Sequence, residues 1–202
     1  MIDLIRAALD AASEQVALVL AAVALCSALD AALGLGVLLP GETGVVLGAI
    51  ALADSPPAVA AAVIAAASGA FAGDHIGFAV GRRFGPALRE TRLVRRLGIQ
   101  HWDAARAFVA RSVWAIIVAR LLPGVRTFVS AAAGASAMPY RRFALVSGVA
   151  ALLWAGIWVV GGAVVGSALL ELAERSTLPV LLGALALVLV VLLVRRRPRA
   201  AR

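Results

Sequence analysis

The sequence predicts an all-α membrane protein, and its composition and the length of its apolar segments carry that prediction. Hydrophobic residues make up 63% of the 202 residues and charged residues 15%, whereas soluble domains are about half apolar and about a quarter charged. A water-soluble core of this size cannot bury so much apolar surface. Lipid is therefore the expected solvent, and we expect residues 1–202 to form a single membrane domain.

The apolar residues fall into runs that are separated by polar or charged residues. These runs lie at 16–29, 31–53, 57–81, 112–137, 143–170 and 177–194. A spanning helix needs about 20 mostly apolar residues, which the third, fifth and sixth runs provide and the first provides with its polar edges. The second run is interrupted at Pro40-Gly41 and the fourth at Pro123-Gly124. We expect about four transmembrane helices and two broken segments that turn back as re-entrant helical hairpins.

The arginines indicate how these segments are oriented. All 19 basic residues are Arg, eight of them lie in residues 82–111, and others end the chain in a basic tail at 195–202. Basic loops stay in the cytoplasm. The arginines of residues 82–111 and those of the tail can both lie on the cytoplasmic side only if the fourth run enters the membrane from that side and returns to it. The second run, with Asp30 and Asp54 at its ends, then turns from outside. Both termini, including an N-terminal amphipathic segment at 1–15, are expected in the cytoplasm.

Two hairpins of opposite orientation, each followed by a full span, make an inverted-repeat arrangement. Inverted repeats with broken helices are typical of transporters, which bind their substrate where the breaks meet. The formal net charge of +8 is explained by orientation signals in the loops, so we expect no nucleic-acid partner. The expected location is the bacterial cytoplasmic (inner) membrane, which the chain crosses several times.

Glycines recur every fourth residue along the third run, at Gly69, Gly73, Gly77, Gly81 and Gly85. This spacing predicts one smooth helix face that allows close approach of another helix. The face can serve an internal contact or a homodimer. After this run, Pro86–Ala110 alternates arginine with apolar residues and is expected to form an amphipathic helix on the inner membrane surface.

Five charged residues at bilayer depth are the candidates for function: Asp30, Glu42, Asp74, Arg120 and Arg126. Each costs about 2.5–3.5 kcal/mol to insert and usually pairs or serves a pathway. Arg120 and Arg126 flank a Pro-Gly break, where guanidinium groups and free backbone N–H groups suit a phosphate. The same spacing also fits arginines that extend to the inner interface as topology anchors.

The acidic candidates suggest proton binding, because buried carboxylates without full compensation take up protons readily. Glu42 follows one Pro-Gly break and Asp30 lies at its outer entrance; the alternative is a static pair that only neutralises the two arginines. Asp74 is a weaker candidate that can hydrogen-bond to a neighbouring helix.

His75 and His101 are too isolated for a metal site, and we expect no metal and no cofactor. Three serines lack a triad partner, so no enzyme is expected: Ser112, Ser130 and Ser147.

Several motifs occur together in a fixed order over about residues 28–160. They are Asp30 ahead of LLPGE (residues 38–42), GDHIGFAVGRRFG (73–85), ARLLPGVRT (119–127), and then Gly134, Met138, Pro139, Phe143 and Trp154. With these motifs the chain resembles the DedA family of bacterial membrane proteins, which is related to the VTT-domain lipid scramblases. The Arg-Pro-Gly-Arg-Thr block is the most specific part. Leu38, Phe78 and Leu121 depart from the residues usual in the family, and these apolar exchanges leave the charged positions intact.

The resemblance implies lipid transport across the membrane, driven by the proton-motive force. The implied substrate is a phosphate-bearing lipid, foremost the undecaprenyl phosphate carrier of cell-envelope synthesis, with phosphatidylethanolamine or phospholipids in general as the alternative. Arg120 and Arg126 carry over as the phosphate-binding arginines, joined by Thr127, and Asp30 and Glu42 as the proton-coupling acids. The residues expected to support this site are Asp74, Pro40, Gly41, Pro123 and Gly124. A proton-coupled transporter of ions or small cations and a non-transporting scaffold remain as rival hypotheses.

Overall fold

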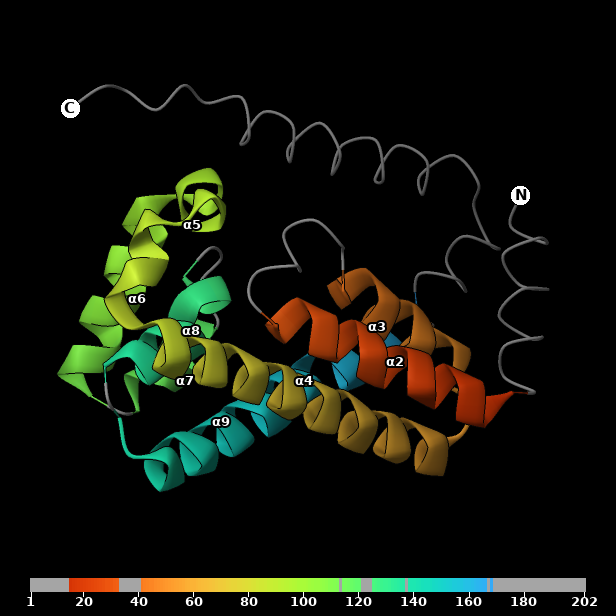
Figure 1. Ribbon diagram of the computed structural model, residues 1–202. Helices are drawn as coiled ribbons and strands as arrows, with labels where there is room; N and C mark the ends of the chain where they lie inside the picture. The colour runs from red at the N-terminus through yellow and green to blue at the C-terminus, as the bar shows by residue number, and fades with distance from the viewer. Residues whose placement is uncertain are drawn as a thin grey trace.

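The computed structural model describes residues 15–32, 41–112, 114–120, 125–136, 138–166 and 168. The helices within these ranges are α2 (Val16–Ala31), α3 (Gly41–Ala51), α4 (Pro56–Phe84), the 3-10 helix η2 (Gly85–Glu90), α5 (Arg92–Leu97), α6 (Ile99–Arg111), α7 (Ala115–Arg120), α8 (Arg126–Ala135), α9 (Tyr140–Ala155) and the π-helical turn η3 (Gly156–Val160). The described part of the chain contains no strand (Figure 1). The all-α prediction is confirmed.

Two of the described helices are long and apolar enough to cross a membrane. They are α4, with 29 residues, and the continuous helix Tyr140–Gly166, with 27 residues. The helix α2 is apolar but shorter, at 16 residues, and the sixth apolar run lies outside the described residues. Four transmembrane helices therefore stay a prediction, and so does the inverted-repeat arrangement.

The long helix α4 is the centre of the packing, because α2 lies against its first half and α8 against its second (Figure 1). The glycine face makes both contacts. A Cβ at Gly69 would overlap the carbonyl oxygen of Ala24 in α2, and a Cβ at Gly81 would overlap that of Ala131 in α8. The predicted close approach of helices is confirmed, and it involves two partner helices rather than one. A homodimer stays a prediction.

One of the five regularly spaced glycines does not belong to this contact face. A Cβ at Gly85 would meet no atom within 4 Å, and its φ is +54°. Gly85 is the C-cap of α4, where a left-handed conformation favours glycine. The prediction that Gly85 contributes to helix packing is therefore wrong, and its conformation explains why a glycine stands there.

Both broken apolar segments contain a helix that starts at or near the Pro-Gly break. The helix α3 begins at Gly41 and packs on α2, while α8 begins at Arg126 and packs on α4. Pro40, Pro123 and Gly124 lie outside the described residues. The helix starts agree with the expected breaks, and the re-entrant path of each hairpin stays a prediction.

The basic segment after α4 is not the single amphipathic helix that its sequence predicted. Thr91 has an extended backbone, and Gly98 has a φ of +108°, so the segment divides into η2, α5 and α6. The apolar face of α6 is covered by protein rather than free for lipid: Trp102, Ala105 and Val109 are buried, and α6 packs on α7 and α8. Local backbone geometry and tertiary packing therefore outweighed the helical periodicity.

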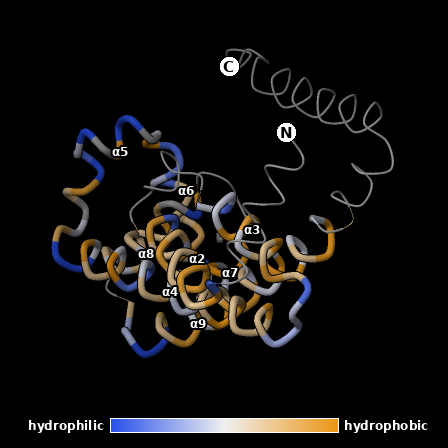
Figure 2. Tube along the Cα trace, turned by 90° about the vertical axis from the view of Figure 1, so that its right-hand side faces the viewer, coloured by the Kyte–Doolittle hydropathy of each residue, from blue (hydrophilic) through white to orange (hydrophobic). Residues whose placement is uncertain are grey.

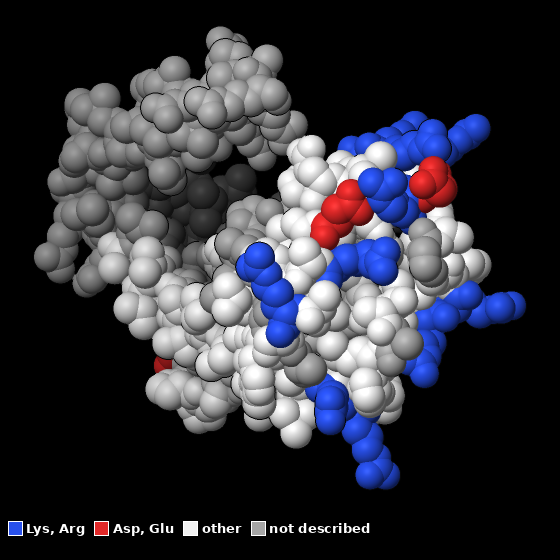
Figure 3. All heavy atoms as spheres, turned by 90° about the vertical axis from the view of Figure 1, so that its left-hand side faces the viewer, with Lys and Arg blue, Asp and Glu red and all other residues white. Residues whose placement is uncertain are grey.

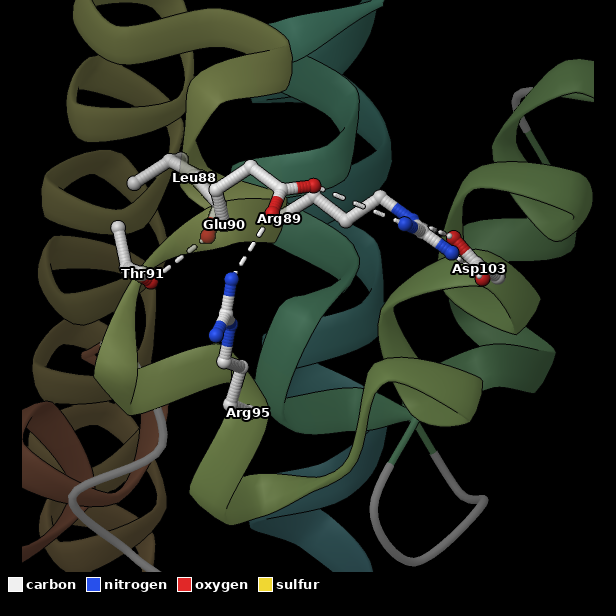
Figure 4. A network of polar contacts seen from close by, with 6 residues as sticks. All are labelled: Leu88, Arg89, Glu90, Thr91, Arg95 and Asp103. Atoms are coloured by element: carbon white, nitrogen blue, oxygen red, sulfur yellow. Dashed lines mark hydrogen bonds and ion pairs between the residues drawn. The ribbon is translucent and has the colours of Figure 1, made fainter.

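Ion pairs hold the short helices of this segment together at the surface (Figure 4). Arg89 donates two hydrogen bonds of 2.9 Å to Asp103, which joins η2 to α6, and Arg95 pairs with Glu90 at 3.1 Å. The Arg89 hydrogen bond holds the pKa of Asp103 below its usual value, and the same contact raises the pKa of Arg89. Thr91 caps α5 by accepting a hydrogen bond from the Val94 N–H.

Polar and apolar residues separate along the molecule. The segments around α5 are hydrophilic, whereas α2, α4 and α9 are mainly hydrophobic (Figure 2). Arginine side chains gather over the face at this hydrophilic end, with acidic atoms in small patches among them (Figure 3). The last turn of α4 and the first turn of α9 also bring arginines to it, at Arg82, Arg83, Arg141 and Arg142. One end of the bundle is therefore basic.

Candidate functional site

Three helix ends meet at the candidate site. Asp30 lies in the last turn of α2, Glu42 in the first turn of α3, and Arg126 is the first residue of α8. In the sequence, Glu42 lies 84 positions before Arg126 and Asp30 lies 96 positions before it. The structure thus brings together three of the charged residues that the sequence singled out.

The guanidinium group of Arg126 binds both carboxylates. Its Nη1 lies 3.2 Å from Asp30 Oδ2 and its Nη2 donates to Asp30 Oδ1 at 3.3 Å, so Asp30 engages both ends of the fork. Nη1 also donates to Glu42 Oε1. Bidentate pairing of arginine with a carboxylate fixes orientation as well as charge. A phosphate would bind the same fork in the same way.

The three charged side chains of the site differ in their exposure. The Asp30 side chain is 7% exposed, Arg126 24% and Glu42 33%. Glu42 is therefore the outer partner and Asp30 the inner one. A ligand that reaches Arg126 would meet Glu42 first.

The helix dipoles act differently on the three charges. Asp30 is an anion at the negative end of α2, and Arg126 is a cation at the positive end of α8; each position is unfavourable by about 0.3–1 kcal/mol. Glu42 lies at the positive end of α3, where a carboxylate is favoured. Asp30 and Arg126 therefore depend on one another for stabilisation. Glu42 retains a favourable position without Arg126.

Asp74 forms a second polar cluster beside the first. It is 4% exposed, and its two carboxylate oxygens accept hydrogen bonds of 2.7 Å from Ser130 and 2.6 Å from Ser147. These contacts join α4 to α8 and α9. Asp74 does hydrogen-bond to neighbouring helices, as its sequence suggested. A small pocket is lined by residues of both clusters, namely Asp30, Ala31, Asp74, Arg126 and Trp154.

The two serines were not predicted as site residues, because a serine without a catalytic-triad partner gives no functional signal in the sequence. Ser130 follows Arg126 by four residues, so both lie on one face of α8, and this spacing could have indicated the connection. Ser147 had no such signal, because its position opposite Asp74 depends on how α9 packs on α4. Trp154 was noted only as part of a motif, and the structure places it at the pocket.

Gly41 has a packing role that explains its position next to Glu42. A Cβ there would lie 2.7 Å from the Cβ of Asp30 and 2.8 Å from the carbonyl oxygen of Cys26. Only glycine allows α3 to begin so close to α2. The close approach is what brings the Glu42 and Asp30 carboxylates to one guanidinium group.

Other predicted site residues cannot be placed as fully. Arg120 ends α7, but its side chain and that of Thr127 lie outside the described residues, as do Pro40, Pro123 and Gly124. Among the residues that the structure describes, no group of three His, Cys, Asp or Glu side chains could hold a metal ion.

A family comparison agrees with this arrangement of motifs. The family model described as the VTT domain matches residues 39–164, which include Glu42, Asp74 and Arg126. The chain belongs to the VTT domain (DedA) family. This membership supports the prediction that the chain is a membrane protein, and it is consistent with a role in membrane transport.

Curated relatives support the same conclusion. An uncharacterized membrane protein of Mycobacterium leprae is 38% identical over 96 residues, covering 47% of this chain and 43% of the relative. One of Mycobacterium tuberculosis is 36% identical over 128 residues, covering 61% and 56%. Protein DedA of Escherichia coli is 34% identical over 97 residues, covering 46% and 43%. The chain spans about half the length of these relatives. No solved structure matches it.

Proposed function

We propose that this VTT-domain protein is a proton-coupled lipid transporter, a flippase that moves a phosphate-bearing lipid across the bacterial cytoplasmic membrane. The proposed substrate is the polyprenyl phosphate carrier, such as undecaprenyl phosphate. The observation that carries the proposal is the Arg126 guanidinium, which two carboxylates hold at the start of a helix while it is still 24% exposed.

A lipid phosphate fits the surroundings of Arg126. The arginine fork can bind two phosphate oxygens, and the first N–H groups of α8 point toward an anion at the same helix end. An anion there also removes the unfavourable interaction of Arg126 with the α8 dipole. Arg120 and Thr127, on either side of the break in the sequence, are proposed to complete the phosphate site.

Proton uptake by the two carboxylates is proposed to control this binding. A proton from outside the cell reaches Glu42 first, because Glu42 is the more exposed of the two acids. The neutral Glu42 releases one side of the guanidinium to the phosphate. Protonation of Asp30 then releases the other side. Proton loss toward the cytoplasm restores both carboxylates, which reclaim Arg126 and expel the phosphate there.

The basic end of the bundle sets the proposed orientation. Arginines at the end of α4, in η2, α5 and α6, and at the start of α9 face one side, which the positive-inside rule assigns to the cytoplasm. Both termini are proposed to lie on that side. The lipid's hydrocarbon chain would stay in the bilayer while its phosphate passes Arg126.

The test is a leaflet-resolved assay on the purified chain in liposomes. A membrane-impermeant phosphatase is added outside, and the fraction of polyprenyl phosphate that becomes accessible is followed with and without a pH gradient. Arg126→Gln should slow transport by about 10- to 150-fold, because hydrogen bonds to a charged group contribute about 1.5–3 kcal/mol. Arg92→Gln, which removes an exposed charge from α5, is the control and should transport normally. Full transport by folded Arg126→Gln would refute the proposal.

The acidic residues give a separate test of proton coupling. Glu42→Gln imitates the protonated side chain, so transport should continue with a weaker dependence on the pH gradient, because only Asp30 still takes up a proton. Asp30→Asn leaves the inner side of Arg126 released and cannot reclaim the guanidinium to expel the phosphate, so transport should be lost. Unchanged gradient dependence in Glu42→Gln would contradict the assignment of this residue.

The alternatives are distinguished by the substrate in the same liposomes. A general phospholipid flippase or scramblase would move labelled phosphatidylethanolamine as fast as polyprenyl phosphate. A proton-coupled transporter of ions or small cations would carry soluble ions in liposomes without polyprenyl phosphate. Once both carboxylates are protonated, the guanidinium favours an anionic group over a cation, because the remaining positive charge of Arg126 repels a cation.

A further inference from the structure

A second groove lies at the basic end, apart from Arg126. It has a volume of about 570 Å³ and is lined by Ser112, Trp114, Arg141, Arg142, Leu145 and Val146. It lies where α9 begins, beside the end of α6 and the start of α7. Since α9 opens a helix long enough to span the membrane, this groove is expected at the level of the lipid head groups.

The charges of the groove are uncompensated within the described part of the chain. Arg141 and Arg142 are exposed, none of the described lining residues is acidic, and no ion pair joins either guanidinium to a described acidic side chain. Arg89 and Arg95 differ in this respect, because each is paired with an acid. The two guanidinium groups of the groove are therefore available to an anion.

An apolar track continues from these arginines along α9. Leu145 is 59% exposed, Val149 38% and Leu152 56%. Residues three or four positions apart share a helix face, so Arg141, Leu145, Val149 and Leu152 form one stripe. Trp114, which is 58% exposed, adds an indole of the kind that is enriched at membrane interfaces.

We propose that this groove binds one anionic glycerophospholipid of the surrounding bilayer. The phosphate would contact Arg141 and Arg142, the glycerol region would lie beside Trp114, and an acyl chain would follow the stripe of Leu145 and Val149. The charges and the apolar stripe together match an amphiphile, whereas a free phosphate would use only the arginines. This site is separate from Arg126 and does not rest on the proposed transport activity.

The test measures which lipid lies next to Trp114. The purified full chain is placed in phosphatidylcholine nanodiscs that contain brominated phosphatidylglycerol or brominated phosphatidylcholine at the same mole fraction, and bromine quenching of fluorescence is recorded. Subtracting the signal of Trp114→Phe isolates this indole from the other tryptophans. Quenching should show that phosphatidylglycerol binds about 30-fold more tightly than phosphatidylcholine. Each arginine near an anionic lipid contributes roughly a fivefold gain in affinity, and the groove has two arginines. Equal quenching by the two lipids would overturn the proposal without any arginine variant.

Variants and a soluble competitor test which groups cause the preference. Arg141→Gln/Arg142→Gln should abolish it, whereas Arg92→Gln/Arg96→Gln, which removes the same charge from exposed positions of α5, should retain it. Equal loss in both pairs would show a general effect of net charge and refute a specific site. Glycerol 3-phosphate should not displace the lipid at equal concentration; displacement would show that the apolar stripe contributes nothing. Arg126→Gln should leave the preference unchanged even if it abolishes transport.

Discussion

Replacing Gly81 with alanine tests the packing that holds α4 and α8 together. A Cβ at this position would overlap the Ala131 carbonyl oxygen and would lie 2.7 Å from its carbonyl carbon and 2.8 Å from its Cα. These are backbone atoms, so α8 must move as a whole. Overpacking of this kind costs about 1–3 kcal/mol, and the better helix propensity of alanine returns about 0.5–1 kcal/mol. We expect Gly81→Ala to lower the free energy of unfolding by about 1–2 kcal/mol.

The matched control is Gly156→Ala. Gly156 has helical backbone angles, and a Cβ there would meet no atom within 4 Å, so this variant should gain about 0.5–1 kcal/mol from helix propensity alone. Reversible unfolding in mixed micelles with increasing dodecyl sulfate, followed by circular dichroism, would measure both variants against the wild type. If Gly81→Ala is as stable as Gly156→Ala, then α4 and α8 do not approach as closely as described.

Two further predictions concern polar contacts. Asp74→Ala removes the shared acceptor of Ser130 and Ser147 and should lower the free energy of unfolding by about 1–3 kcal/mol for each buried hydroxyl left unpaired. Asp74→Asn keeps an acceptor and should lose clearly less stability in the same unfolding assay. Equal losses in the two variants would contradict this prediction. Arg89 lowers the pKa of Asp103 through its hydrogen bond, so the stabilising contact should be fully present above the unfolded pKa of about 3.9 and be lost as the pH falls through the lower folded value. In Arg89→Gln the Asp103 midpoint measured by carboxyl NMR should rise, and an unchanged midpoint would show that the pair does not form in solution.

The sequence supported the prediction of the helices and of the charged site for physical reasons that do not depend on the tertiary fold. A charge inside an apolar run is costly wherever the run packs, so Asp30, Glu42 and Arg126 could be selected without a structure. A four-residue glycine spacing gives a smooth helix face in any helix. That Gly69 contacts one helix and Gly81 another could not be predicted, because it depends on which helices lie beside α4.

The sequence did not predict the helix break at Gly98 or the position of Ser147, because local backbone geometry decides the first and helix packing decides the second. The arginine-rich segment has helical periodicity, but Gly98 adopts a positive φ and interrupts it. The glycine within residues 97–100 is the sequence signal for this break. Ser147 is one hydroxyl in a long apolar run, and only the rotation of α9 about its axis places it at Asp74. Such rotations follow from the whole bundle and not from a motif.

The glycine contacts of α4 hold two helices of the charged site in place, and this limits which residues of the site can move. The contacts of α2 with Gly69 and of α8 with Gly81 are made by backbone atoms, so these helices cannot shift without breaking the packing, and they carry Asp30 and Arg126. The helix α3 packs differently beyond its first residue, because Gly44 and Gly48 face side chains of α2 rather than its backbone. Side chains can change rotamer where a backbone cannot. Glu42, at the start of α3, is therefore the partner that can leave Arg126 first, while Asp30 still holds the guanidinium, and the proposed substrate phosphate would enter from the Glu42 side.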